Sequence, residues 1–301
     1  MSKFLNNSKV NWMVAIAACL MFSQCTKSKL DDDFQVGNPP PVAGGYTNSS
    51  EIEPSNLVAY FPFDGNIADN KGTVTGGVLT GTSNFQGGIK GQAYQGKTGT
   101  FITYANPGLV AGLTSFTVSF WINTQKHDGG AQGIFGLGKA DGSFWGNFFV
   151  IIEGNNTSSN KMQSKLHFEK NVTPSIPNTE NWVDPAEALR PNDMYGAWRQ
   201  ITYTYDETTS KVAYYANGQA IDIGNDANRT SNGTAPLGPL AFKSATKFVI
   251  GGYQNHAGAP FGGLEPWMLN YTGKLDEMRI YKKALTSQQV SALYQLERQG
   301  R

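Results

Sequence analysis

Three tryptophans in the 301-residue sequence stand in polar, irregular surroundings that suit ligand binding. Trp145 occurs in DGSFWGNFF, Trp182 in NTENWVDP and Trp267 in LEPWMLN. An exposed indole ring can lie against the flat apolar face of a sugar while nearby Asn, Asp or Gln side chains bind its hydroxyl groups. A loop tryptophan can equally close the end of a hydrophobic core, so both roles stay open for each residue. Weaker candidates for the same surface are Tyr253, Asn255 and Asp184.

A short acidic turn offers hard oxygen ligands for a cation. Asp64, Gly65 and Asn66 are consecutive, and Asp69 follows shortly after them. Ca²⁺ takes about six to eight oxygen ligands, and carboxylate and amide groups supply them. Asp-Gly-Asn is also an ordinary turn sequence whose side chains bind nearby backbone amides. A structural calcium ion and a metal-free turn are therefore both open.

Residues suited to catalysis are harder to find. Glycoside hydrolysis needs two carboxyl groups about 5–9.5 Å apart. Asp276 and Glu277 are adjacent, so a regular strand would turn them to opposite faces. The sequence has no Gly-x-Ser-x-Gly motif, and His127, His167 and His256 are too scattered for a zinc site. We interpret these histidines as polar surface residues and expect a binding protein rather than an enzyme.

An antiparallel meander over Trp198–Ile223 indicates the fold class. Apolar and polar residues alternate in Ile201–Tyr205, which is the period of a half-buried strand. The turn-forming run Asp206–Ser210 leads to a second alternating strand. Asn217 and Gly218 both tolerate positive φ, as a type I′ hairpin turn requires, and a third short strand follows. This pattern predicts an all-β protein.

Further strands are predicted on both sides of the meander. They are expected around residues 57–63, 74–79, 93–94, 101–104, 116–122, 134–137, 148–152, 166–168, 247–251 and 275–280. The cleanest alternation places Phe116, Val118, Phe120 and Ile122 on the core face. The uninterrupted apolar run at 148–152 predicts either burial on both faces or one side that faces a groove.

Local signals predict how several of these elements begin, end or bend. Pro62 cannot donate to a strand ladder, so the first strand should lie at an edge or a bulge. The parity of apolar residues changes after Leu275, which predicts a β-bulge at Asp276-Glu277. Thr286-x-x-Gln289 is a capping box that opens a short C-terminal helix. The stretch Asn171–Ala197 contains four prolines and is expected to be irregular, with at most one helical turn at 185–189.

Four stretches resemble, in order along the chain, the laminin-G-like or concanavalin A-like jelly-roll family. Besides the meander they are Leu57–Gly72 (LVAYFPFDGNIADNKG), Ser115–Thr124 (SFTVSFWINT) and Phe261–Tyr294, which contains GKLDEMRIY. The resemblance covers roughly residues 57–296. It implies an all-β, concanavalin A-like jelly-roll β-sandwich of two antiparallel sheets with a short C-terminal helix.

The resemblance also bears on the metal and on catalysis. In related sandwiches a structural Ca²⁺ ion lies where the first and last strands meet, which would add Asp276 to Asp64, Asn66 and Asp69 as ligands. The hydrolases of this superfamily carry Glu-x-Asp-x-(x)-Glu on one strand, and this sequence has no such stretch. Fold alone does not define function, because sites are grafted onto folds.

The N-terminus resembles a bacterial lipoprotein signal. A basic start precedes the apolar stretch Trp12–Phe22, which is shorter than the roughly 20 residues that span a bilayer. Cys25 is favoured as the lipidated residue because the apolar run ends just before it. Ile16-Ala17-Ala18-Cys19 fits the short cleavage motif better, so Cys19 remains an alternative, as does an ordinary cleaved signal with a free cysteine.

These signals divide the chain into three parts. Residues 1–24 are predicted to be the signal peptide and 25–55 a flexible polar tether, in which Asp31–Asp33 is either a surface-export signal or a solvated linker. Residues 56–301 would form one jelly-roll domain, since sandwiches of about 200–250 residues commonly do. The net charge of +1 and the lack of a long basic run argue against nucleic-acid partners.

Taken together, the sequence favours an exported, lipid-anchored protein of the outer membrane or cell surface that binds an extracellular glycan or polysaccharide. One alternative is an adhesion module that recognises a protein partner. Another is a glycoside hydrolase or lyase with an unfamiliar acid pair.

Overall fold

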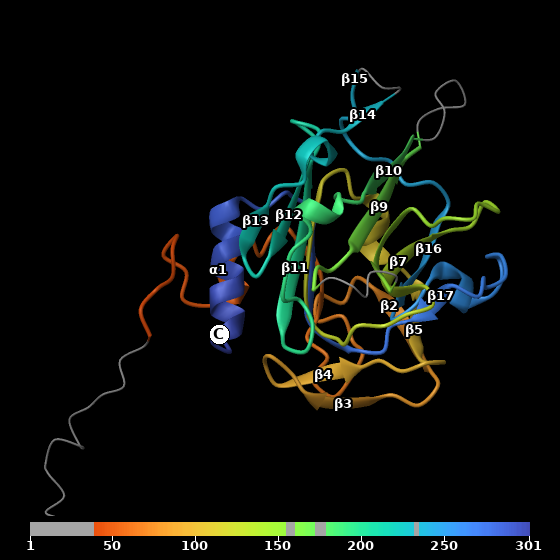
Figure 1. The fold of residues 1–301 in the computed structure, drawn as a ribbon, viewed down its shortest axis with the longest axis horizontal. Coiled ribbons are helices and arrows are strands. Elements are labelled where there is room, and N and C mark those ends of the chain that lie inside the picture. Colours follow the sequence, from red (N-terminus) through yellow and green to blue (C-terminus); the bar gives the residue numbers. More distant parts are fainter. Residues whose placement is uncertain (1–38, 155–159, 172–178, 232–234) are drawn as a thin grey trace, which may run out of the picture. The chain divides into compact units, whose positions relative to one another are not determined.

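The computed structural model describes residues 39–154, 160–171, 179–231 and 235–301. They include one compact unit, Pro41–Arg301, in which two large sheets, each of eight strands, pack against each other (Figure 1). All pairings in these sheets are antiparallel except that of β17 with β7. The predicted signal peptide, Cys19 and Cys25 lie outside the described residues. Within the described part of the chain, no helix combines the length and apolar character needed to cross a membrane.

The first sheet runs, in spatial order, β13 (Gln219–Ile221), β12 (Lys211–Ala216), β11 (Arg199–Asp206), β6 (Phe116–Asn123), β18 (Lys274–Tyr281), β4 (Gln92–Gln95) and β3 (Asn84–Gly87), with β1 (Leu57–Phe61) also beside β18. The second sheet runs β10 (Thr179–Val183), β9 (Ser164–Lys170), β8 (Phe148–Glu153), β7 (Ala131–Lys139), β16 (Ala245–Ile250), β5 (Phe101–Asn106) and β2 (Thr75–Thr80), with β17 (Met268–Asn270) beside β7. The other elements are the β14–β15 pair (Thr230–Ser231, Ala235–Pro236), the 3₁₀ helices η1 (Ser49–Glu51), η2 (Gly108–Gly112), η3 (Glu187–Leu189), η4 (Gly224–Ala227) and η5 (Gln254–Ala257), and helix α1 (Ser287–Arg298).

The hydrophobic core lies between the two sheets, as the predicted fold class requires. The alternating residues Phe116, Val118, Phe120 and Ile122 of β6 are fully buried in it, which confirms their expected face. Aromatic rings join the sheets across the core, and the centroids of Phe116 and Phe148 are 4.6 Å apart. The all-β jelly-roll prediction is therefore confirmed.

The last strand, β18, is bulged where the sequence predicts. Its register with β6 shifts between Asp276 and Arg279, and Glu277 has a φ of 46°. The extra residue lets Leu275, Met278 and Ile280 all enter the core, although their parity in the sequence differs. The bulge also buries both acidic side chains completely.

The predicted turn and cap are also present. Asn217 and Gly218 have φ of 51° and 75° between β12 and β13, which fits a type I′ turn. Thr286 and Gln289 form both hydrogen bonds of the capping box at the start of α1. The helix covers the outer face of the first sheet, where Trp121 donates to Glu297 at 2.7 Å.

Two segments differ from the sequence-based expectation. The compact unit begins at Pro41 rather than at residue 56, because Ile52 is fully buried in a cluster with residues of α1. The stretch Asn171–Ala197, expected to be irregular, contains the edge strand β10, in which Trp182 is opposite His167 of β9. An edge strand pairs on one side only and need not alternate strictly, so its polar sequence gave no strand signal. Short η3 falls within the helical turn that was expected there.

Candidate ligand-binding site

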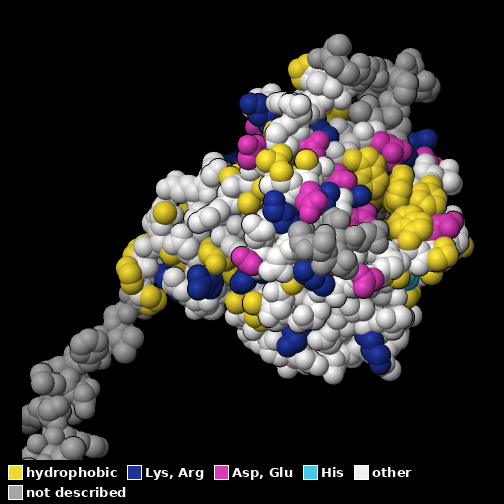
Figure 2. Space-filling model, in the orientation of Figure 1, with side chains coloured by type: hydrophobic (Ala, Val, Ile, Leu, Met, Phe, Trp, Pro, Cys, Tyr) yellow, Lys and Arg dark blue, Asp and Glu magenta, His cyan; other side chains and the backbone are white. Residues whose placement is uncertain are grey.

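The three loop tryptophans of the sequence analysis converge on the outer face of the second sheet. Trp145 lies between β7 and β8, Trp182 on β10, and Trp267 immediately before β17. The ring centroids of Trp145 are 5.1 Å from those of Trp182 and 5.7 Å from those of Trp267. All three side chains are half-buried, so part of each remains accessible. Figure 2 shows a hydrophobic patch flanked by acidic and basic side chains over the region of β9 and β10.

Strand β8 supplies the floor beneath the tryptophans. Phe148 and Val150 enter the core between the sheets, whereas Phe149 and Ile151 belong to the tryptophan cluster on the opposite face. This division explains why β8 is apolar throughout, and it confirms the predicted burial on both faces. The Trp145 ring stacks on Phe149 at 5.5 Å.

His167 of β9 completes this floor and corrects the expectation that the histidines lie at the surface. Its side chain is fully buried, stacked on Phe149 at 4.5 Å and in edge contact with Trp182 at 4.6 Å. Burial lowers the pKa of His167, which favours a neutral imidazole. Its Nε2 lies 3.4 Å from Glu169 Oε1, and Glu169 Oε2 accepts a 2.6 Å hydrogen bond from Lys139 Nζ. A buried polar network therefore underlies the aromatic cluster.

The three indoles and Ile151 border a pocket of about 320 Å³ that has one charged wall. Lys165 Nζ lies 2.9 Å from a carboxylate oxygen of Glu153 and 3.2 Å from one of Asp184. All three charged side chains line the pocket and remain partly exposed. The pocket thus combines flat apolar surfaces with fixed hydrogen-bonding groups, the combination used by sites for small polar ligands. Glu153 and Lys165 were not predicted, because neither belongs to a motif and they meet only through the pairing of β8 with β9.

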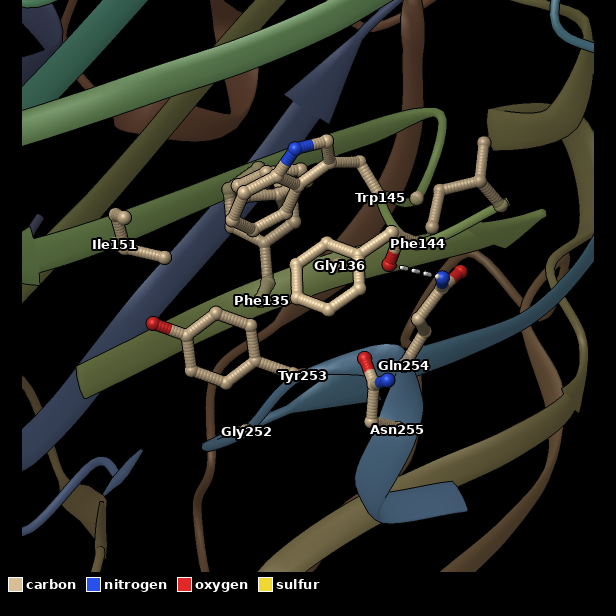
Figure 3. Close-up of a pocket in the computed structure, with 12 residues that line it drawn as sticks. Phe135, Gly136, Phe144, Trp145, Ile151, Gly252, Tyr253, Gln254 and Asn255 are labelled. Carbon is tan, nitrogen blue, oxygen red and sulfur yellow. Dashed lines mark hydrogen bonds between the residues drawn. The ribbon is translucent and has the colours of Figure 1, made fainter. Parts of the chain in front are cut away.

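Tyr253 and Asn255 are buried, and together with Phe144 and Trp145 they line a small neighbouring pocket (Figure 3). The Tyr253 hydroxyl donates to the carbonyl of Ala131 at 2.8 Å, and its ring meets Trp267 edge-on at 5.8 Å. Asn255 Nδ2 donates to the carbonyls of Gly262 and Gly263, which holds the loop before β17. In this structure both residues support the site through packing and loop anchoring. A direct role in binding sugar stays a prediction.

Phe144 is a further accessible ring that the sequence analysis did not single out. It is 44% exposed and lies 4.7 Å from Trp145 and 6.2 Å from Trp267 between ring centroids. The Gln254 side chain donates to the Phe144 carbonyl at 3.0 Å, which anchors this loop to η5 (Figure 3). Phe144 therefore extends the aromatic surface at the edge of the cluster.

Two of the proposed calcium ligands, Asp64 and Asp276, accept hydrogen bonds from the turn between β3 and β4. Asp64 Oδ1 accepts from the amide of Gln92 at 2.7 Å, and Asp276 Oδ2 accepts from the amides of Ile89 and Lys90. Burial, together with adjacent Glu277, raises the pKa of Asp276 to about 8. A cation beside this carboxylate would oppose that rise.

The other two proposed ligands, Asp69 and Asn66, bind other backbone amides. Asp69 accepts from backbone amides that include those of Tyr60 and Val74, and Asn66 caps the amide of Ala68. Among the described residues, no group of three or more His, Cys, Asp or Glu side chains is close enough to hold a metal ion. The oxygen donors suit calcium in type, and backbone carbonyls would have to supply part of its shell. Calcium binding stays a prediction.

Solved structures with a similar fold include domain 4 of AbnA, an extracellular arabinanase of family GH43 from Geobacillus stearothermophilus, in complex with arabinotriose. It is 20% identical, with a TM-score of 0.52 over 79% of this chain and 98% of that one. A botulinum neurotoxin type C structure, described as showing that cell entry depends on two ganglioside molecules, is 13% identical, with a TM-score of 0.53 over 82% of this chain and 52% of that one. The receptor-binding domain of neurotoxin type G is 14% identical, with a TM-score of 0.50 over 80% and 51%. This chain thus spans about half the length of the two toxin chains.

At these identities the likenesses support the fold alone. No curated protein shows a significant sequence match. Residues 96–291, however, match the laminin-G-type family described as the concanavalin A-like lectin/glucanases superfamily. The match covers most of the compact unit and agrees with its two sheets and terminal helix, and the chain belongs to this superfamily.

Proposed function

We propose that the protein is a lectin-like module that binds an extracellular glycan in the pocket between Trp145, Trp182 and Trp267. The observation that carries this proposal is the convergence of three half-buried indoles from separate parts of the chain around one pocket. Aromatic rings held by mutual packing lose little conformational freedom on binding. They therefore suit a ligand that offers flat C–H faces.

The charged wall gives such a ligand its polar contacts. Glu153 and Asp184 can accept hydrogen bonds from sugar hydroxyls, and Lys165 can donate to them. The similar fold of the arabinanase domain, whose structure contains arabinotriose, supports the proposal, as does that of the neurotoxin whose structure concerns gangliosides. We further propose cell-surface display through a lipid at Cys25, and no catalytic activity.

Single substitutions test the proposal directly. Replacing Trp145, Trp182 or Trp267 by Ala should weaken retention of glycans in affinity electrophoresis about tenfold or more, because each change removes one wall of the pocket. Replacing Leu109, which is exposed on η2 outside the pocket, by Ser is the matched control and should change nothing. Thermal unfolding checks that each variant is folded. Normal glycan retention by all three folded variants would contradict the proposal.

A hydrolase is the second candidate, because Glu153 and Asp184 approach the same Lys165 in the pocket. A hydrolase would release soluble oligosaccharides from a polysaccharide, and Glu153→Gln or Asp184→Asn would abolish that release. Binding without product release favours the lectin. Capture of a protein with no glycan bound would instead favour the adhesion alternative.

A further inference from the structure

The tryptophan pocket adjoins a second and larger hollow. Trp267 lines the pocket, whereas its neighbours Pro266 and Met268 line a groove of about 650 Å³. Met268 also belongs to the apolar cluster beneath the tryptophans, together with Tyr253 and Ile151. The pocket and the groove therefore share the chain segment around Trp267 as a common wall.

The groove repeats the chemistry of the pocket with different residues. Half-buried Phe101 of β5 lies 5.3 Å from His256 between ring centroids, and both rings line the groove. His256 Nδ1 accepts from the amide of Tyr253 at 3.0 Å, which fixes the imidazole beside Phe101. Exposed Thr98 and Glu265 add a hydroxyl and a carboxylate to the same walls. As in the pocket, aromatic rings fixed in position therefore lie next to hydrogen-bonding groups.

Carboxylates outnumber cations in the two hollows. Asp128 and Glu265 line the groove, and the described residues that line it include no Lys or Arg. In the pocket, Lys165 is already paired with both acidic residues of the wall. An anionic sugar would lose hydration here and meet mostly like charge. An uncharged sugar can donate its hydroxyl protons to the same carboxylates without that penalty.

We propose that the pocket and the groove are consecutive subsites for one uncharged polysaccharide chain that passes over the Trp267 segment. This inference rests on the proposed glycan-binding function and adds the length and charge of the ligand. Sites for drug-sized ligands measure about 300–1,000 Å³. The pocket lies near the lower end of that range and the groove in its middle, so together they exceed the needs of a single terminal sugar.

A length series of oligosaccharides tests the proposal by isothermal titration. The probes are fragments, from dimer to octamer, of neutral linear arabinan, xylan, mannan and mixed-linkage β-glucan, with polygalacturonate fragments as anionic probes. Affinity of the unchanged protein for one of the neutral series should rise with length until both subsites are filled. Phe101→Ala should lower affinity for the longest fragments about tenfold and leave the shortest unaffected. Trp182→Ala should weaken binding at every length.

Three results would overturn the inference in distinguishable ways. Equal length dependence in the unchanged and Phe101→Ala proteins would eliminate the groove while leaving the tryptophan pocket intact. Tighter binding of polygalacturonate than of every neutral fragment would refute the charge argument. Failure of the unchanged protein to bind any fragment would refute the proposed function itself. Glu265→Ala, at an exposed position of the groove, provides a second variant if Phe101→Ala does not fold.

Discussion

Replacing Glu169 by Gln should destabilise the protein, because it breaks a buried ion pair beneath the tryptophans. Lys139 and Glu169 are 4% and 1% exposed, and their charged atoms are 2.6 Å apart. Burial alone raises the pKa of Glu169, but hydrogen bonds from His167 and Lys139 outweigh it and hold the pKa below its ordinary value. Glu169 is therefore ionised at neutral pH. The variant leaves a buried ammonium group that Asp141, 3.9 Å away, compensates only in part.

The size of the effect follows from this geometry. Removing one partner of a buried pair costs about 3–5 kcal/mol. We expect about 3 kcal/mol, because the Gln amide keeps one acceptor and Asp141 remains nearby. For a domain of this size that corresponds to a fall in Tm of about 6–12 °C. The double variant Lys139→Met/Glu169→Gln removes both charges and should cost only about 1–2 kcal/mol.

Urea unfolding followed by tryptophan fluorescence measures all four proteins of this cycle. The two single changes should each cost more than the double change, with a coupling energy of about 2 kcal/mol or more. Costs below about 1 kcal/mol for both single variants, or strictly additive costs in the double variant, would refute the idea that this pair is charged and buried. Glycan binding by the double variant then reports whether the network also positions His167 beneath Trp182.

Two further predictions concern other parts of the fold. Hydrogen bonds from Lys283 and Gln289 lower the pKa of Glu53 to about 2, so its stabilising effect is present above about pH 4.5 and is lost as the pH falls through 2. Because Glu53 is partly solvent-exposed, Glu53→Gln should cost only about 1 kcal/mol at pH 7 and progressively less as the pH falls through 2, as thermal unfolding across this range would reveal. If calcium binds at Asp64 and Asp276, EDTA should lower Tm and excess Ca²⁺ should restore it. Asp276→Asn should abolish that response, whereas Asp69→Asn should lower Tm with or without EDTA; an unchanged Tm in EDTA would contradict the calcium prediction.

The fold could be predicted from the sequence because its signals are local. The alternation in β6, the turn at Asn217-Gly218 and the capping box at Thr286 each depend on residues within one element or one turn. The bulge in β18 could be predicted as well, because the apolar residues change parity along the strand and one extra residue is needed to keep them on the same face. Short edge strands escaped prediction because pairing on one side only leaves little constraint on their sequence. Strand β3 (NFQG) and strand β10 (TENWV) are examples.

The candidate site could be predicted only in part. Trp145, Trp182 and Trp267 stand out as aromatic residues in polar surroundings, but nothing local shows that they meet. Their meeting depends on the pairing of β10 with β9 and on the packing of two loops over β8. The burial of His167 escaped prediction for the same reason, because its partners Phe149 and Trp182 lie on neighbouring strands.

The two outer faces of the sandwich place their tryptophans in different surroundings. On the first sheet, Trp121 is covered by α1, where it stacks on Tyr294 at 5.3 Å and is 1% exposed. On the second sheet, the loops that precede β8 and β17 cover the face only in part, and Trp145 and Trp267 remain partly exposed. Helix α1 covers the apolar surface around Trp121, whereas the loops of the second face leave apolar surface that a ligand can bury. The partly exposed tryptophans of the second sheet are therefore the ones for which we propose ligand binding, whereas Trp121 is part of the packing beneath α1.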